Sequence, residues 1–303
     1  MSSIARRTPR IALATYDRAP ELAADDRLIP PALAAVGIEA VAAVWSDGRA
    51  PWETFDAVLI RSCWDYHLRS GEFRAWLDRL DAGRVPVWNS TALVRWNADK
   101  RYLLDLAARG VPSLPTIVIP PGAADRVAAA AAERGWTRFV LKPTVSASGY
   151  ETHAFRFPLT SADHAAVERV SAAGAALLQP FADAIPALGE LSFVFLDGRP
   201  SHAALKRAAA GEFRVQTEHG GSVEPIDADP LLAEQAAAAL TALDEVPLYA
   251  RVDGVVIDGR FVLMELELIE PNLFLALGRD APARLATAVA RRLEAVGSRR
   301  GPA

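Results

Sequence analysis

The chain has 303 residues, 51% of them hydrophobic and 23% charged, a balance typical of a folded protein with two or three packed subdomains. Its formal net charge is −4, and no basic stretch is interleaved with aromatic residues, which argues against nucleic acid as a partner. The apolar run at 11–14 is too short for a signal peptide or a membrane span, and the single cysteine, Cys63, favours a reducing compartment. We therefore expect a cytoplasmic protein with no membrane partner.

Strands and helices alternate in the first region, residues 1–95. The predicted elements are strand 11–16, helix 27–36, strand 38–44, strand 57–62, helix 71–80 and strand 85–88. Strands joined in this way by single helices form a parallel, doubly wound sheet. The sequence therefore predicts an N-terminal domain of the α/β class.

The carboxyl ends of these strands form the expected functional rim, because ligands bind beyond that edge of a doubly wound sheet. Arg18, Arg61 and Asp65 are predicted to lie at this edge. Two bases and one acid suit a zwitterion, so they favour a small amino acid or a derivative as the substrate. The alternative is a structural segment in which Trp64 and Tyr66 only pack and Asp65 caps the next turn.

Two lysines in the second region, residues 96–182, lie in neighbourhoods that suggest phosphate binding. The predicted elements there are helix 98–109, strand 115–119, helix 123–134, strand 139–143 and strand 152–157. Lys100 opens the first helix, and Lys142 ends an apolar strand just before the polar loop 144–152. Loop amides beside a fixed ammonium form a phosphate cradle, although either lysine alone is also typical of a protein surface. Neither a Walker loop nor a Gly-x-Gly-x-x-Gly motif is present.

An acidic hairpin lies in the third region, residues 183–303. Its turn at 258–259 separates Asp253 on one strand from Glu265 and Glu267, which alternate onto one face of the next strand. Three carboxylates this close must either take up protons or bind a cation. Mg²⁺, or Mn²⁺, is the hard cation that fits such oxygen ligands best.

Taken together, these segments resemble the ATP-grasp superfamily, the fold of glutathione synthetase and D-alanine:D-alanine ligase, from about residue 11 to residue 293. The resemblance implies an ATP-grasp fold, α+β in its ATP-binding part, preceded by the parallel α/β domain. In that family two lysines, a mobile loop, a hinge after a strand and an acid bind ATP. The matching residues here are Lys100, Lys142, Ser146, Ser148, Gly149, Gln179, Phe181 and Glu190.

The same resemblance implies a metal site and a set of catalytic residues. Asp253, Glu265 and Glu267 match the Mg²⁺ ligands, although the family usually has Glu-x-Asn where this chain has Glu265-x-Glu267. Glu270 follows closely, so the second glutamate ligand is either Glu267 or Glu270, and Glu270 is also a candidate substrate residue. The matching catalytic residues are Arg251, Lys206 and Arg214.

The expected reaction begins when a substrate carboxylate, or the oxygen of a urea or amide, attacks the γ-phosphorus of ATP. An amine then captures the acyl phosphate. Lys142, Lys206 and Arg251 offset the charge that spreads over the transferred phosphoryl group. Arg214 either holds the acyl phosphate or the substrate carboxylate, or is a surface charge on a strand.

Within the superfamily, the segments 61–66, 96–103 and 265–271 are most similar to a bacterial subgroup that includes a cyclo-ligase forming D-cycloserine from O-ureido-D-serine. We therefore expect an ATP-dependent carboxylate–amine ligase that releases ADP and phosphate and acts between two molecules or within one. Two alternatives stay open: a nucleotide-binding regulatory protein that has lost catalysis, and a small-molecule kinase with the same fold. The sequence also leaves open whether the chain forms a homodimer.

Overall fold

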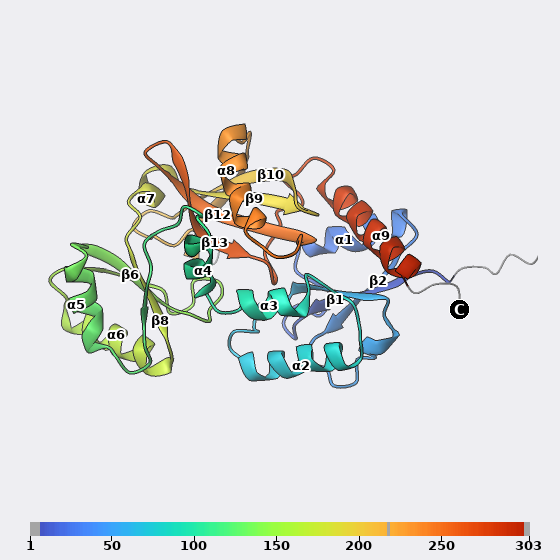
Figure 1. Ribbon diagram of the computed structural model, residues 1–303, viewed down its shortest axis with the longest axis horizontal. Helices are drawn as coiled ribbons and strands as arrows, with labels where there is room; N and C mark the ends of the chain where they lie inside the picture. The colour runs from blue at the N-terminus through green and yellow to red at the C-terminus, as the bar shows by residue number, and fades with distance from the viewer. Residues whose placement is uncertain (1–6, 217–218, 300–303) are drawn as a thin grey trace, which may run out of the picture.

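The computed structural model describes residues 7–216 and 219–299, and within these ranges the chain forms three β-sheets with helices packed on them (Figure 1). This mixed α/β architecture confirms the fold class predicted from the sequence. None of the helices in these ranges is long and apolar enough to cross a membrane.

The N-terminal sheet is parallel throughout, as predicted. Its strands lie in the order β2-β1-β3-β4 and are β1 (Arg10–Thr15), β2 (Glu39–Val44), β3 (Ala57–Ser62) and β4 (Val87–Trp88). Alternate residues of β1 enter two separate apolar clusters, with Ile11 and Leu13 in one and Ala12 and Ala14 in the other. Burial on both faces explains why the central strands are continuous apolar runs.

Helices from both ends of the chain cover this sheet. They are α1 (Ile29–Ala35), α2 (Ser70–Ala82) and α9 (Ala281–Arg299), together with the short 3-10 helices η1 (Asp26–Leu28) and η2 (Trp52–Thr54). Phe73 and Trp76 of α2 pack on one face of the sheet. The helix α9 packs Leu285 and Val289 beside α1 on the other face (Figure 1). The last helix of the third region thus completes the core of the first.

The second sheet is antiparallel and has the order β5-β8-β6-β7. Its strands are β5 (Ile117–Ile119), β6 (Arg138–Pro143), β7 (His153–Arg156) and β8 (Ala176–Pro180). The sequence suggested a βαβ unit here, and β5 and β6 do run in the same direction, but β8 lies between them and pairs antiparallel with both. The helices α5 (Asp125–Glu133) and α6 (Ser161–Ala173) pack on this sheet through Val127, Val167 and Val170.

The third sheet carries the acidic hairpin and is antiparallel, in the order β11-β10-β9-β12-β13. Its strands are β9 (Glu190–Leu196), β10 (Arg199–Arg207), β11 (Ser222–Ile226), β12 (Tyr249–Ile257) and β13 (Arg260–Glu267). The β12–β13 turn has φ of 50° at Asp258 and 74° at Gly259, a conformation that favours Asp-Gly and matches the twist of the strands. The helix α7 (Ala184–Leu188) precedes β9, and α8 (Pro230–Thr241) packs on the sheet through Ala236 and Ala239.

The helix predicted at 98–109 is broken. The chain instead forms α3 (Thr91–Asn97), a turn that contains Lys100, and α4 (Tyr102–Ala108). Long-range hydrogen bonds hold the break in place. The Asn97 amide donates to the carbonyl of Leu266 at 2.8 Å and accepts from the N–H of Leu268 at 2.9 Å, and the Lys100 N–H donates to the carbonyl of Thr144 at 2.7 Å. The break therefore fixes Lys100 beside β13.

Candidate active site

A cavity of about 470 Å³ collects side chains from all three regions of the chain. Its volume lies within the range of about 300–1,000 Å³ found for small-molecule sites. All the residues predicted to bind ATP or metal, or to act in catalysis, line it: Lys100, Lys142, Ser146, Ser148, Gly149, Gln179, Phe181, Glu190, Lys206, Arg214, Arg251, Asp253, Glu265 and Glu267.

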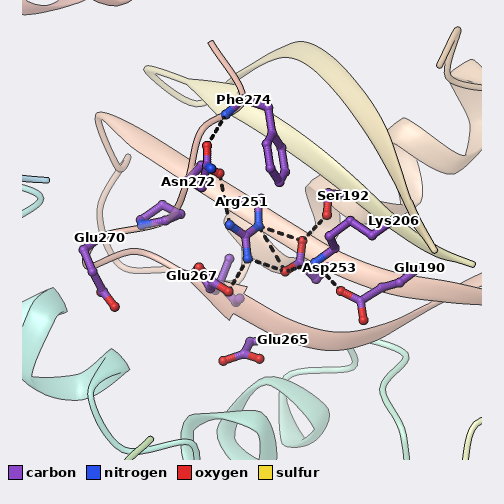
Figure 2. Close-up of polar contacts among 12 residues, drawn as sticks. Glu190, Ser192, Lys206, Arg251, Asp253, Glu265, Glu267, Glu270, Asn272 and Phe274 are labelled. Carbon is purple, nitrogen blue, oxygen red and sulfur yellow. Dashed lines mark hydrogen bonds and ion pairs between the residues drawn. The ribbon is translucent and has the colours of Figure 1, made fainter. Parts of the chain in front are cut away.

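Charges of alternating sign run along one wall of this cavity (Figure 2). Lys206 on β10 pairs with Glu190 on β9, and its Nζ lies 3.0 Å from Oδ2 of Asp253 on β12. Asp253 also accepts from the Arg251 guanidinium at 2.8 Å, and Arg251 pairs in turn with Glu267 on β13. Strand register produces this row, because Arg251 lies opposite Glu267 and Asp253 lies opposite Glu265 on the same face of the hairpin.

The charge of Asp253 is fixed by its surroundings. Burial alone would raise the pKa of this carboxyl, but Arg251 and Lys206 outweigh that effect and hold the pKa well below its usual range. Ser192 Oγ donates a further hydrogen bond to it at 2.6 Å. Asp253 is therefore an ionised group that positions two cations facing the cavity.

The two predicted ATP lysines differ in their partners. Lys100 Nζ donates to the carbonyl of Ser146 at 2.7 Å and pairs with Glu265 at 2.7 Å. Lys142, on β6, is 9% exposed and has no hydrogen-bond or ion-pair partner for its ammonium within the described residues. Burial lowers the pKa of Lys142, and the nearby charge of Lys100 adds to the shift. The charge of Glu265 opposes this shift, so Lys142 is a buried ammonium that faces the cavity near acids but forms no direct ion pair within the described residues.

The polar loop after β6 meets a second loop over the cavity. Ser148 and Gly149 both have positive φ, 50° and 68°, so the chain turns sharply at this point of the loop. A Cβ on Gly149 would lie in ordinary contact, 3.4 Å from Arg214 Cδ, so the two loops meet at this position. Arg214 lies on a loop, not on a strand, and its Nη2 pairs with Glu212 at 2.7 Å.

The predicted hinge after β8 is held from both sides. Gln179 Nε2 donates to Thr116 Oγ1 at 2.8 Å. The guanidinium of Arg138 lies 3.7 Å from the centre of the Phe181 ring, and the Phe213 ring lies 6.1 Å from it. This packing fixes an aromatic wall at the hinge end of the cavity.

The acidic residues do not form a preassembled metal cluster. Within residues 7–216 and 219–299, no three His, Cys, Asp or Glu side chains are arranged to hold a metal ion. The expectation that these carboxylates must take up protons or bind a metal cation left out a third arrangement, because Lys100, Lys206 and Arg251 form ion pairs with them. Burial nevertheless raises the pKa of Glu267 to about 7, and Asp253 and Glu265 add to this shift against the opposing charge of Arg251. Carboxylate oxygens of Asp253, Glu265 and Glu267 that line one cavity are a donor set that fits a hard divalent cation.

Most of the residues predicted to bind substrate at the rim of the N-terminal sheet lie away from this cavity. Arg18, Arg61 and Asp65 do not line the cavity. Arg61 is fully buried and donates twice to Oδ1 of Asp26, at 3.0 and 2.9 Å. Asp65 accepts from Trp45 Nε1 at 2.8 Å, and Arg18 is exposed. The prediction fails for Arg61 because β3 is covered on both faces up to Ser62, so its last side chains enter the core.

Glu270 is the one substrate candidate that lines the cavity, together with Trp64 and Tyr66 from the first region. Burial raises the pKa of Glu270 to about 8, and the charge of Glu267 adds to the shift. Sequence reasoning missed two neighbours, Asn272 and Phe274, although their position just after the acidic strand is a signal that could have found them. The Asn272 carbonyl accepts from Arg251 at 3.0 Å, and the Phe274 ring lies 5.4 Å from the same guanidinium.

Comparison with solved structures identifies the class of protein. The crystal structure of D-cycloserine synthetase DcsG has a TM-score of 0.85 at 35% sequence identity, over 94% of this chain and 99% of that one. D-alanine–D-alanine ligase from Bacillus anthracis, complexed with ATP, has a TM-score of 0.68 at 14% identity, over 98% of this chain and 100% of that one. The chain belongs to the ATP-grasp ligases, ATP-dependent enzymes that form carbon–nitrogen bonds.

Within that family the chain is related to D-cycloserine synthetase. It is 36% identical over 282 residues to the cycloserine biosynthesis protein DcsG of Streptomyces lavendulae, an alignment that covers 88% of this chain and 94% of the relative. Residues 11–89 match the family described as the N-terminal domain of D-cycloserine synthetase DcsG. The resemblance inferred from the motifs is thereby confirmed.

Proposed function

We propose that this chain is a carboxylate–amine ligase that acts through an acyl phosphate on a small amino acid or amino-acid derivative. The observation that best supports this proposal is Lys142, whose buried ammonium faces the cavity without a direct ion pair among the described residues. A buried cation of this kind is stabilised by an incoming anion. The phosphates of ATP supply that anion, in the same cavity as Lys206 and Arg251.

In the first step, a carboxylate oxygen of the substrate attacks the γ-phosphorus of ATP. The bond from that phosphorus to the β,γ-bridging oxygen breaks, which yields ADP and an acyl phosphate. Lys142, Lys206 and Arg251 offset the negative charge on the transferred phosphoryl group. Because Asp253 already holds Lys206 and Arg251, these two cations need little reorganisation when ATP binds.

Asp253, Glu265 and Glu267 are the residues that would hold Mg²⁺ or Mn²⁺, whose role is to neutralise phosphate charge. To do so, Glu265 would leave Lys100 and Glu267 would leave Arg251. The phosphates would then replace the glutamates as partners of the two basic side chains. The ion pairs seen along the cavity wall thus fit the ATP-free form of such a site.

In the second step, an amine nitrogen attacks the acyl carbon, the bond from that carbon to the phosphate oxygen breaks, and the nitrogen loses a proton. The products are an amide and phosphate. Arg214, which lines the cavity on the loop that meets Gly149, is placed to hold the acyl phosphate. An amine on the same molecule closes a ring, and the name of the relative, D-cycloserine synthetase, makes ring closure the first case to test.

The test incubates the protein with Mg²⁺, ATP and a panel of amino acids and derivatives that includes O-ureido-D-serine. We expect ADP and free phosphate in equal amounts, a product without phosphorus in the mass spectrum, and loss of turnover in Lys142→Ala. Glu234→Gln, an exposed position on α8, serves as the matched control and should behave as wild type. A phosphorylated product would identify a kinase. Nucleotide binding without turnover for the whole panel would identify a regulatory protein.

A further inference from the structure

The end of the cavity at Glu270 contains acid and aromatic groups. Trp64, Tyr66 and Glu270 line it, and Tyr66 is buried. Arg61, from the neighbouring strand β3, is turned away into the core, where it binds Asp26. Within the described residues no side chain donates a hydrogen bond to the Glu270 carboxylate or forms an ion pair with it.

Figure 2 shows that Glu270 projects away from the row of paired charges. Glu267 and Arg251 lie between Glu270 on one side and Lys206 and Glu190 on the other. Lys206 therefore lies toward one end of this row and Glu270 lies beyond the other end, where the charge of Lys100 also acts on it. A substrate whose carboxylate reaches Arg251 would extend its remaining atoms toward Glu270.

The backbone that carries Glu270 is held at three successive carbonyls. The carbonyl of Glu270 accepts from Trp64 Nε1 at 3.2 Å, that of Pro271 accepts from Arg61 Nη2 at 2.6 Å, and that of Asn272 accepts from Arg251 Nη1 at 3.0 Å. Side chains from β3, from the segment just after it and from β12 thus fix the position of the Glu270 Cα. A fixed backbone with a free carboxylate is the arrangement expected of a group that selects a ligand.

We propose that Glu270 selects substrates whose far end donates hydrogen bonds, either an ammonium or the NH₂ of an amide or urea, and rejects substrates with a second carboxylate. This inference rests on the proposed function and specifies its substrate class. Burial raises the pKa of Glu270 to about 8, so above that pH its ionised, partly buried carboxylate forms strong, charge-assisted hydrogen bonds with such donors. An acid at the same place would meet like charge and lose its hydration without a partner, so discrimination arises from repulsion as well as from attraction.

The test uses three amino acids of similar size: 2,3-diaminopropionate, asparagine and aspartate, each as both enantiomers. Their binding to the full chain saturated with Mg²⁺ and ADP is measured by calorimetry above pH 8, where the raised pKa of Glu270 leaves its carboxylate ionised. In the wild type we expect the first two to bind at least about tenfold more tightly than aspartate, the ratio expected from one charge-assisted hydrogen bond. Glu270→Gln should lower the preference for diaminopropionate over aspartate by about tenfold, and Glu270→Lys should reverse it. Glu234→Gln should leave it unchanged.

Three results would overturn the selection by Glu270: equal binding of asparagine and aspartate to the wild type, no binding of any of the three, or an unchanged preference in folded Glu270→Gln and Glu270→Lys. A requirement for more Mg²⁺ in Glu270→Gln, equal for every ligand, would assign Glu270 to the metal site instead. Turnover is measured separately. If the wild type prefers diaminopropionate and asparagine over aspartate but releases no ADP, only the proposed ligase reaction is refuted. If ADP is released but the Glu270 variants keep the wild-type preference, only the selection by Glu270 is refuted.

Discussion

Replacing Arg61 with methionine keeps most of the side-chain volume but removes a positive charge from a buried network of ion-pair and hydrogen-bond contacts. The side chain of Arg61 is 0% exposed and that of its partner Asp26 is 5% exposed. Its guanidinium also lies 4.6 Å from the centre of the Tyr249 ring and donates to the carbonyl of Pro271. Without the arginine, the Asp26 carboxylate would keep only the hydrogen bond from Ser62 Oγ, at 2.7 Å.

The expected cost of Arg61→Met is about 3–5 kcal/mol in the free energy of unfolding, the range for breaking one side of a buried ion pair. That is a large fraction of the roughly 5–15 kcal/mol that stabilises a typical domain. The double variant Arg61→Met with Asp26→Asn should recover at least 1 kcal/mol, because no unpaired buried charge is left.

The assay is urea unfolding followed by tryptophan fluorescence, since Trp45, Trp52 and Trp76 are buried in the core beside β3. Kinetics are measured at a temperature at which the variant is folded. A variant with wild-type stability and a tenfold higher KM for the amino-acid substrate would refute this reasoning and restore Arg61 to the substrate site.

Three further predictions concern the cavity. Lys142→Ala should weaken ATP binding at least about tenfold, measured by calorimetry. The thermal midpoint of unfolding should stay nearly unchanged, because the Lys142 ammonium has no ion pair to lose. A variant that binds ATP with wild-type affinity would contradict the assignment of the ATP site. Chelation of divalent metal, or Glu265→Gln or Asp253→Asn, should abolish ADP release, and full activity in metal-free buffer would refute the metal site. Folding raises the pKa of Glu270 from 4.5 to about 8, so Glu270 lowers the free energy of unfolding progressively between pH 4.5 and 8, fully above pH 8, and not below pH 4.5. Glu270→Gln should therefore raise the free energy of unfolding at pH 8.5 by about 2 kcal/mol, a value reduced because Glu270 is partly exposed. At pH 4 the substitution should leave the free energy of unfolding unchanged. Equal effects at both pH values would show that burial of the charge is not the cause.

Local sequence was sufficient wherever a feature depends on neighbours in the chain. Single helices between apolar runs predicted the parallel N-terminal sheet. Asp258-Gly259 predicted the hairpin turn, because few residues adopt two positive φ angles in succession. Two-residue alternation along β13 then placed Glu265 and Glu267 on one face, and an apolar strand ending in Lys142 before a polar loop indicated a phosphate site.

Tertiary structure alone decided which groups meet. The alternation of β3 gives no information about which layer covers each face, so only the fold shows that Arg61 binds Asp26 in the core and not a ligand at the rim. Strand order placed β8 between β5 and β6, and hydrogen bonds between Asn97 and β13 divided a predicted helix into α3 and α4. The charge state of each acid depends on its distance to basic groups on other strands, because in a low dielectric a few ångströms decide between repulsion and an ion pair. Those distances are set by strand pairing across the chain, so the sequence specified the side chains of the site, and the packing of the three sheets specified their partners.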